Sequence, residues 1–113
     1  MNIPLLRRIQ KAILRYPKRF LMSDIAQSVD CGTAYCIAGW AEHLMRLDGK
    51  NLSRKGRFVG QVALGLRSDE KTMRLILMSR WPARFQGIDD GSKKAAKRAV
   101  ARIDHFIATE GRE

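Results

Sequence analysis

The sequence has no long hydrophobic segment, because lysine or arginine interrupts every apolar run. No run approaches the ~18 residues that a membrane-spanning helix requires, so we expect no membrane span. The N-terminal region also lacks an uninterrupted apolar core followed by a small-residue cleavage site, which argues against a secretory signal. These absences predict a soluble, cytoplasmic protein.

Cysteine is scarce, with two residues among 113. In a chain without an export signal, such cysteines are more often reduced thiols than a structural disulfide. A chain of this length should bury about two-thirds of its unfolded surface without any cross-link. We therefore expect one domain over residues 1–113 that needs no disulfide, with residues 110–113 forming a frayed tail.

Acidic residues are few: 11 Asp and Glu stand against 22 Lys and Arg, which gives a net charge of +11. This excess favours an anionic partner, which could be nucleic acid, anionic lipid or an acidic protein. Residues 4–16 have well-separated basic and apolar faces, as a helix lying on a membrane would. A helix packed on a protein core shows the same pattern, and this segment has no tryptophan or lipid anchor, which disfavours the membrane surface.

Alternating strand patterns are absent, as are Asn-Gly or Asp-Gly turns between apolar runs, whereas helical periodicity recurs along the chain. The pattern predicts an all-α fold, a compact single-domain bundle of five to six helices. Leu14 breaks the apolar stripe of the first helix, and Pro17 should end that helix. The expected helices span residues 4–16, about 23–28, 33–48, 53–66, 68–81 and 92–110.

The run "CGTAYCIAGWA" at residues 31–41 is the most distinctive segment of the chain. Its simplest interpretation is structural: Gly32 allows a sharp entry, Thr33 caps a helix, and Cys36 and Trp40 face the core. We expect Ile37, Ala41, Leu44 and Leu47 on the same buried face.

The same run supports a second interpretation, because a thiol near a helix N-terminus has a depressed pKa. A thiol-dependent enzyme or a redox switch would use Cys31 and Cys36, with His43 as a base or hydrogen-bond partner. The two cysteines could also approach within the ~7 Å between α-carbons that a disulfide needs. A zinc site built from these residues and His105 is disfavoured, because Cys36 and His43 lie two helical turns apart. We expect no metal and no cofactor.

Four segments carry a resemblance: "CGTAYCIAGWA", the later "ALGL", "WPARF", and the closing "AVARIDHFIATEGRE". Together they resemble a group of small uncharacterised bacterial and phage proteins that contain Cys-Gly-Thr-x-x-Cys-Ile-Ala-Gly. The similarity runs in order over most of the chain. The resemblance implies a phage-related family and no particular activity.

Basic residues recur on the sides of the expected helices that face away from their apolar stripes, and "KNLSRKGR" at residues 50–57 adds four more. The leading hypothesis is a non-catalytic binding or accessory protein, rather than an enzyme, that engages DNA, RNA or an acidic protein. The candidate contact residues are Arg7, Arg8, Lys94, Lys97, Arg98 and Arg102.

A helix-turn-helix is the alternative suggested by "VALGLRSDEKTMRLI" at residues 62–76. Lys71 and Arg74 occupy positions of the second helix that should be apolar. Asp69 and Glu70 would repel phosphates at the start of the recognition helix. The sequence therefore argues against base-specific DNA reading by this segment.

Overall fold

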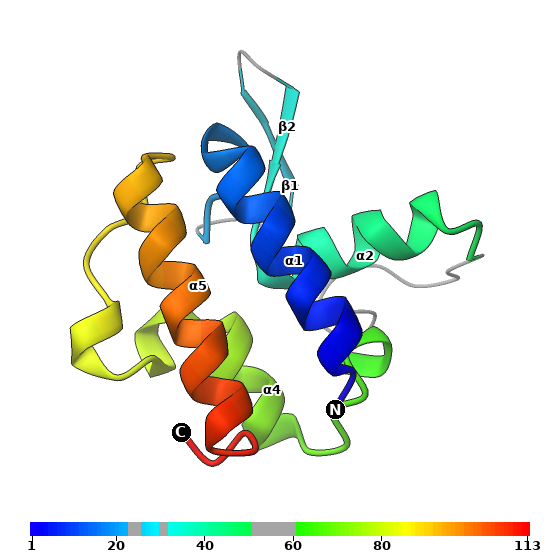
Figure 1. Ribbon diagram of the computed structural model, residues 1–113, viewed down its shortest axis with the longest axis vertical. Coiled ribbons are helices and arrows are strands. Elements are labelled where there is room, and N and C mark those ends of the chain that lie inside the picture. The colour runs from blue at the N-terminus through cyan, green and yellow to red at the C-terminus, as the bar shows by residue number, and fades with distance from the viewer. Residues whose placement is uncertain (23–25, 30–31, 51–60) are drawn as a thin grey trace.

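A computed structural model describes residues 1–22, 26–29, 32–50 and 61–113 (Figure 1). The chain is mostly helical and forms one compact bundle, which confirms the predicted all-α fold class. None of its described helices is both long and apolar enough to cross a membrane. The elements, with η marking 3-10 helices, are α1 (Ile3–Arg15), η1 (Pro17–Arg19), β1 (Ala26–Val29), β2 (Gly32–Tyr35), α2 (Ile37–Leu47), α4 (Asp69–Ile76), η2 (Met78–Arg80), η3 (Ala83–Phe85) and α5 (Lys93–Ala108).

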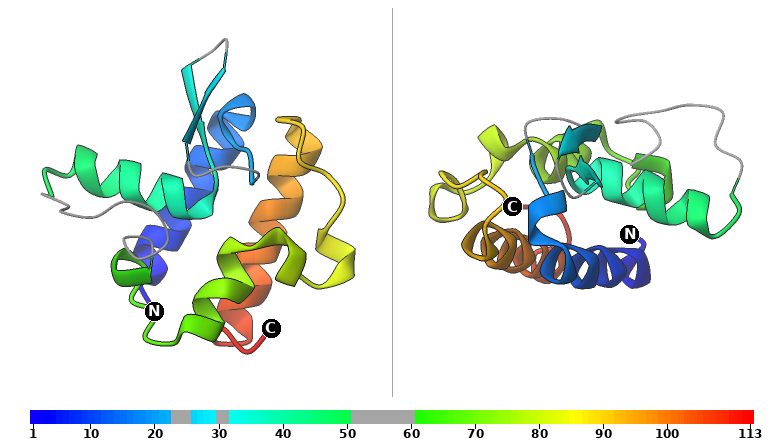
Figure 2. Two further views of the ribbon diagram at one scale, coloured as in Figure 1. Left: turned by 180° about the vertical axis from the view of Figure 1, so that it is seen from behind. Right: turned by 90° about the horizontal axis from the view of Figure 1, so that it is seen from above.

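Helices α1 and α5 lie side by side and run in opposite directions (Figure 1). Seen from above, they form one layer, and α2, α4 and the β1–β2 hairpin pack on the other side (Figure 2). The antiparallel arrangement places the C-terminal end of α1 next to the N-terminal end of α5.

Helix α1 follows the predicted pattern closely. Asn2 caps it by accepting a hydrogen bond from Leu5 N at 3.1 Å, and it ends at Arg15 ahead of Pro17. Leu14 is 47% exposed, as its break in the stripe predicts. The predicted apolar stripe is buried at Leu5, Leu6, Ile9 and Ile13, is partly buried at Ala12 and is exposed at Tyr16.

A polar side chain that the hydrophobic pattern does not identify joins α1 to α5. Gln10 is buried, and its Nε2 donates to Val100 O at 3.0 Å and to Asp104 Oδ1 at 2.9 Å. Its Oε1 accepts from Arg7 Nη1 at 2.8 Å. These bonds satisfy the amide inside the helix interface, where an unpaired polar group would be costly.

The region after η1 differs from the prediction. Instead of a helix at residues 23–28, residues 26–29 form strand β1, which pairs antiparallel with β2 from Ala26 opposite Tyr35 to Val29 opposite Gly32. The next helix consequently begins at Ile37 rather than Thr33, because residues 32–35 belong to the hairpin. Residues 23–25 and 30–31 lie outside the described residues.

Cys36 takes the capping role that the sequence assigned to Thr33. Its Sγ accepts a hydrogen bond from Gly39 N at 3.5 Å at the start of α2. The predicted inward face of α2 is buried at Cys36, Ile37, Trp40, Ala41 and Leu44. Leu47 is the exception, 67% exposed on the last turn of α2.

Serine caps start both later helices. Ser68 Oγ accepts from Lys71 N at 3.3 Å, and Ser92 Oγ accepts from Ala95 N at 3.1 Å. Helix α4 ends at Ile76 instead of 81, because Leu77 is extended and η2 follows. The buried stripe of α5 includes Ala96, Ala99, Ile103 and Phe106, with Val100 and Ile107 partly buried.

The predicted helix at 53–66 lies mostly outside the described residues, which resume at residue 61. Residues 61–63 are helical, and Val62 is 80% exposed. In the tail, which the sequence predicts to be frayed, Gly111 is buried, and its N donates to Phe106 O at 2.8 Å. Arg74 Nη1 also donates to Gly111 O at 3.0 Å, which fastens the tail to α4.

The packing of α1 generates a stability prediction. Ile13→Ala should lower the free energy of unfolding by about 2–4 kcal/mol, because the fully buried side chain leaves a cavity. Leu14→Ala, one residue further along the same helix, should change it by less than about 0.5 kcal/mol. Urea denaturation followed by circular dichroism measures both, and equal losses would contradict this packing.

Candidate functional site

Two of the predicted contact residues, Arg7 and Arg8, are engaged in ion pairs between helices. Arg7 pairs with Asp104 of α5. Arg8 holds Asp48, at the end of α2, through Nη1–Oδ2 at 2.6 Å and Nη2–Oδ1 at 3.2 Å. That hydrogen bond raises the pKa of Arg8 and lowers the pKa of Asp48. The positive charges of Arg7 and Arg8 are therefore largely compensated by carboxylates of the protein itself.

Arg102 was predicted on the exposed face of α5, and this prediction is wrong. Its side chain is fully buried, with Nη1 donating to Glu113 O at 2.7 Å and Nη2 to Arg74 O at 2.9 Å. The guanidinium also lies 5.6 Å from the centre of the Phe106 ring. A long side chain next to the apolar stripe can reach inward when main-chain oxygens and aromatic rings receive its charge.

The burial of Arg102 is electrostatically costly. Desolvation, followed by the neighbouring charge of Arg84, lowers its pKa to about 10, against an opposing effect of Glu113. Its Nε has no hydrogen-bond partner among the described residues. Arg102 therefore ties α5 to α4 and the tail, and it cannot contact a ligand at the surface.

Arg98 is also partly committed to the fold. It is half-buried, and its Nη1 donates to Gln86 O at 2.7 Å, which holds the loop after η3 against α5. Lys94 and Lys97 are exposed, and neither makes an ion pair within the described part of the chain. Of the six predicted contact residues, these two lysines are the ones whose side chains stay available.

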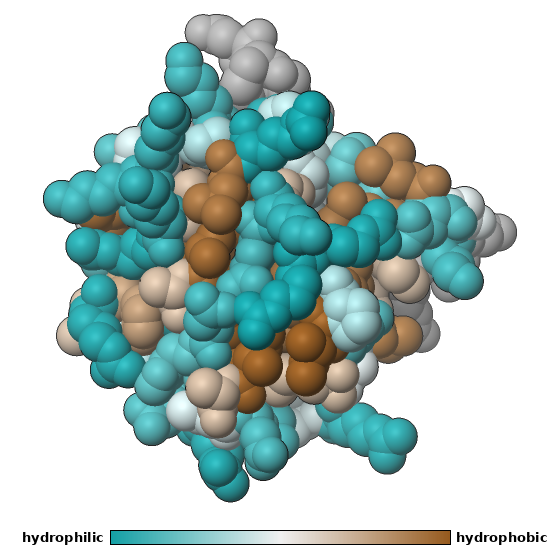
Figure 3. Space-filling model, viewed as in Figure 1, coloured by the Kyte–Doolittle hydropathy of each residue, from teal (hydrophilic) through white to brown (hydrophobic). Residues whose placement is uncertain are grey.

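The structure adds other available cations to these lysines at the same end of the molecule. They come from the last turns of α1, from η1 and from the first turns of α5, where hydrophilic side chains gather in Figure 3. Across the described ranges, none of them makes an ion pair with a carboxylate. We call this set the basic face: Lys11, Arg15, Lys18, Lys93, Lys94 and Lys97.

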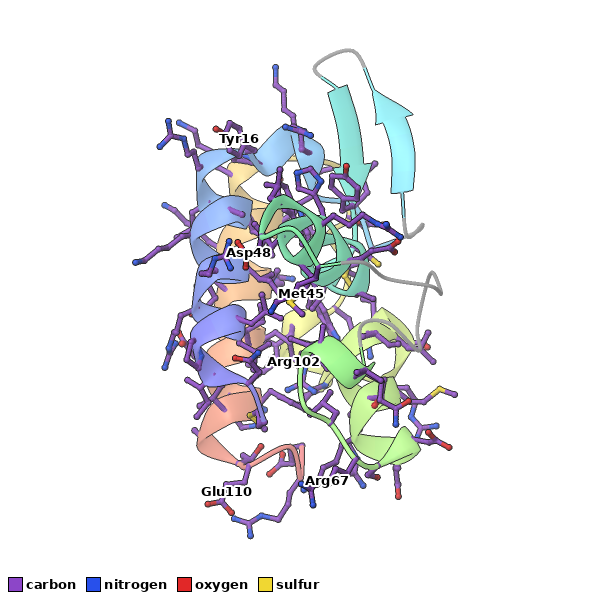
Figure 4. All side chains as sticks on the ribbon, turned by 90° about the vertical axis from the view of Figure 1, so that its right-hand side faces the viewer. Tyr16, Met45, Asp48, Arg67, Arg102 and Glu110 are labelled. Atoms are coloured by element: carbon purple, nitrogen blue, oxygen red, sulfur yellow. The ribbon has the colours of Figure 1, made fainter. Side chains whose placement is uncertain are left out.

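Within the basic face lies a pocket of about 420 Å³ between the end of α1, η1 and the start of α5, which we call the basic pocket. Tyr16, which marks it in Figure 4, lies at the opposite end of the molecule from Arg67 and Glu110. Four of the residues that line the basic pocket are cationic and none is acidic. The lining residues are Arg15, Tyr16, Pro17, Lys18, Arg19, Gly91, Ser92 and Lys93.

Carboxylates do occur in the loop before α5, but the main chain engages them. Asp89 Oδ1 accepts from Met22 N at 2.6 Å, and Asp90 Oδ1 accepts from Ser92 N at 3.0 Å. The bonds with Ser92, and then the charge of Lys94, lower the pKa of Asp90. Neither carboxylate lines the basic pocket.

The sequence predicted a basic outer side for the first helix, but that helix was expected to end at Pro17, and its basic side was not extended beyond the proline. The signal was present in "RYPKR" at residues 15–19, where three cations surround a tyrosine and a proline. Their meeting with Lys93 is tertiary, since more than seventy residues separate the two segments along the chain. No local pattern predicts such a meeting.

The thiol candidates occupy a different environment. Cys36 is 4% exposed. His43 stacks on Tyr35, with ring centroids 4.8 Å apart, and its Nδ1 lies 3.2 Å from Tyr35 Oη. Burial and then the charge of Arg19 lower the pKa of His43. This setting favours a packing role for Cys36; Cys31 lies outside the described residues.

Metal ligation finds no support in the described part of the chain, where no group of three His, Cys, Asp or Glu side chains could hold an ion. His105 lies instead beside Arg84 and Glu113, with Nε2 3.5 Å from Glu113 Oε1.

Comparison with known proteins identifies no relative: no family model, curated protein or solved structure matches the chain. The resemblance to small bacterial and phage proteins therefore stays a prediction. The interpretation of the site depends on its own geometry and charge.

The buried position of Cys36 predicts slow thiol chemistry. In a Cys31→Ser background, Cys36 should react with a thiol reagent such as dithionitrobenzoate much more slowly in the native protein than in urea, because the sulfur is shielded from solvent. Stopped-flow absorbance measures the two rates. A native rate equal to that in urea would indicate an accessible thiol and revive the thiol-dependent alternative.

The buried position of Arg102 predicts a structural phenotype. Arg102→Ala should lower the free energy of unfolding by about 1–3 kcal/mol, because two partly buried hydrogen bonds to main-chain oxygens are lost. Lys97→Ala, on the exposed side of the same helix, should change it by less than about 0.5 kcal/mol. Chemical denaturation compares the variants, and an unchanged stability of Arg102→Ala would contradict this role.

Proposed function

We propose that this protein is a non-catalytic nucleic-acid-binding protein that contacts phosphates through the basic face. The observation that carries the proposal is the gathering, at one end of the molecule, of six exposed cations that make no ion pair within the described ranges. Elsewhere in the described structure, Arg7, Arg8, Arg46 and Arg74 are each paired with a carboxylate. An anion from outside the chain would neutralise the charge that the fold leaves at this end.

The composition of the basic face favours nucleic acid over an acidic protein. Four of its six cations are lysines of η1 and α5, and a fifth lysine lies on α1. Lysine is depleted in protein–protein interfaces, which select aromatic residues and arginine, whereas it is a regular contact of phosphates. On both helices, cations also recur one turn apart, as Lys11 and Arg15 on α1 and as Lys93 and Lys97 on α5, which suits a repeating anion.

The contacts should be largely independent of base sequence. Lysine binds phosphate as a point charge, and phosphate contacts position a protein without reading bases. The helix that would read DNA in the helix-turn-helix alternative is α4, which begins with exposed Asp69 and Glu70. The phosphate backbone of DNA would repel those carboxylates, so α4 is not proposed as a contact element.

The proposal predicts strongly salt-dependent binding. For a fluorescently labelled strand of about 20 nucleotides, six phosphate contacts should give a slope of log affinity against log salt of about −4 for single strands and about −5 for duplex. Fluorescence anisotropy between about 50 and 200 mM KCl measures the slope. Absent binding, or binding that salt leaves unchanged, would overturn the proposal.

A matched pair of double variants tests the location of the contacts. Lys94→Gln with Lys97→Gln should reduce the steepness of the slope by about 1.4–1.8, because two phosphate contacts are lost. Arg67→Gln with Arg80→Gln removes the same charge from exposed positions on other elements and should leave the slope close to that of the parent protein. Equal effects of the two variants would show that net charge, rather than the basic face, drives binding.

A further inference from the structure

The basic pocket differs from the rest of the basic face because it is a depression between α1, η1 and α5, and four of its lining residues are cationic. We propose that this pocket binds a terminal phosphomonoester, the phosphate that ends a nucleic-acid strand. The inference rests on the proposed function, and it adds that the protein distinguishes phosphorylated strand ends from internal phosphates. The pocket is the place where the geometry, and not charge alone, selects a ligand.

The arginines of the pocket are oriented before any ligand arrives. The guanidinium carbons of Arg15 and Arg19 lie 5.5 and 5.7 Å from the centre of the Tyr16 ring. Such a contact restricts the guanidinium plane of Arg15, so less side-chain entropy is lost when this arginine binds an anion. A guanidinium offers two parallel donors to two oxygens of one phosphate, which makes it suited to a group with several free oxygens.

The walls of the pocket are also fixed by the fold. Trp40 Nε1 donates to Arg19 O at 3.2 Å, which anchors η1 to α2. Gly91, which also lines the pocket, adopts a positive φ of 75° and contacts η1, since an added Cβ would lie at van der Waals distance, 3.5 Å, from Lys18 Cα. The pocket is therefore formed in the absence of a ligand, which lowers the cost of binding.

Charge and shape favour a monoester over an internal diester. A phosphomonoester carries about −1.5 to −2 charges near pH 7 and three free oxygens, whereas a diester carries one charge and two free oxygens. Arg15, Lys18 and Lys93 line the pocket, so the additional charge and oxygen of the monoester both gain partners. A volume of about 420 Å³ is in the range of small-ligand sites and is large enough for a phosphate group.

The experiment compares strands that differ only at their ends. The probes are one labelled sequence with a 5′-phosphate, with a 3′-phosphate or with hydroxyl ends, and a hydroxyl-ended strand two nucleotides longer that carries at least as much charge. We expect one of the phosphorylated strands to bind about tenfold more tightly than both hydroxyl-ended strands, because the monoester gains charge-assisted hydrogen bonds. Equal affinities for all four strands would overturn the inference and leave the proposed function intact.

A matched pair of variants locates the preference. Lys18→Gln with Lys93→Gln removes two charges from the pocket, and Lys94→Gln with Lys97→Gln removes two from its surroundings; all four side chains are exposed. The pocket variant should lose most of the tenfold preference, whereas the other variant should bind every strand more weakly and keep the preference. Circular dichroism confirms that both variants fold. A preference that survives in the pocket variant would contradict the assignment.

Competition with a nucleoside monophosphate tests whether the phosphomonoester that the pocket binds belongs to a strand end or to a small free compound. If it competes with the phosphorylated strand at similar concentrations, the pocket recognises the monoester itself, and the strand adds little. If it competes only weakly, contacts along the basic face contribute to binding, as the proposed function requires. If no strand binds but the nucleoside monophosphate binds and is lost in the pocket variant, the proposed function fails and the pocket assignment stands.

Discussion

The packing of α1 against α5 is the constraint on which the remaining structure depends. It buries the apolar stripes of both helices and encloses Gln10. The hydrogen bonds from the Gln10 side-chain amide to α5 replace the hydrogen bonds that this amide would make with water. The antiparallel arrangement also brings two basic helix ends together. Like charges repel, so this meeting destabilises the fold, and the apolar burial along the two helices must offset the repulsion. A charge arrangement that opposes folding is more readily explained by a ligand than by stability.

The carboxylates of the protein are engaged away from the charges of the basic face. The chain has 11 acidic residues, and several of them serve at the joints of the structure: Asp104 joins α5 to Arg7, Asp48 joins α2 to Arg8, and Asp89 and Asp90 hold main-chain groups before α5. The basic face receives none of them as an ion-pair partner within the described ranges. Its charge is therefore left to solvent and to any anionic partner.

The sequence predicted the parts of the fold that repeat with the helical period. It located α1 and α5 and their buried stripes, because apolar residues recur every three to four positions over three turns or more. It missed the hairpin, whose strands of four residues are too short to establish an alternating pattern. It also placed Arg102 outside, because periodicity classifies residues by polarity and ignores that a long side chain can turn its charge toward main-chain oxygens. The basic pocket depends on segments distant in sequence, so the only local signal for it was the two arginines and one lysine of "RYPKR".

The distinctive segment at residues 31–41 acquires a role through this arrangement. Its described part contains Trp40, which packs with Tyr35 and His43, stacks on Tyr16 at a centroid distance of 6.5 Å, and holds η1 through Arg19 O. Cys36 caps the helix that carries Trp40, and both side chains are buried in the same core. The chemistry suggested by the thiol is therefore not needed to explain why the segment is built from small and aromatic residues. Its small residues allow α2 to pack closely, and close packing fixes the tryptophan that positions one wall of the basic pocket.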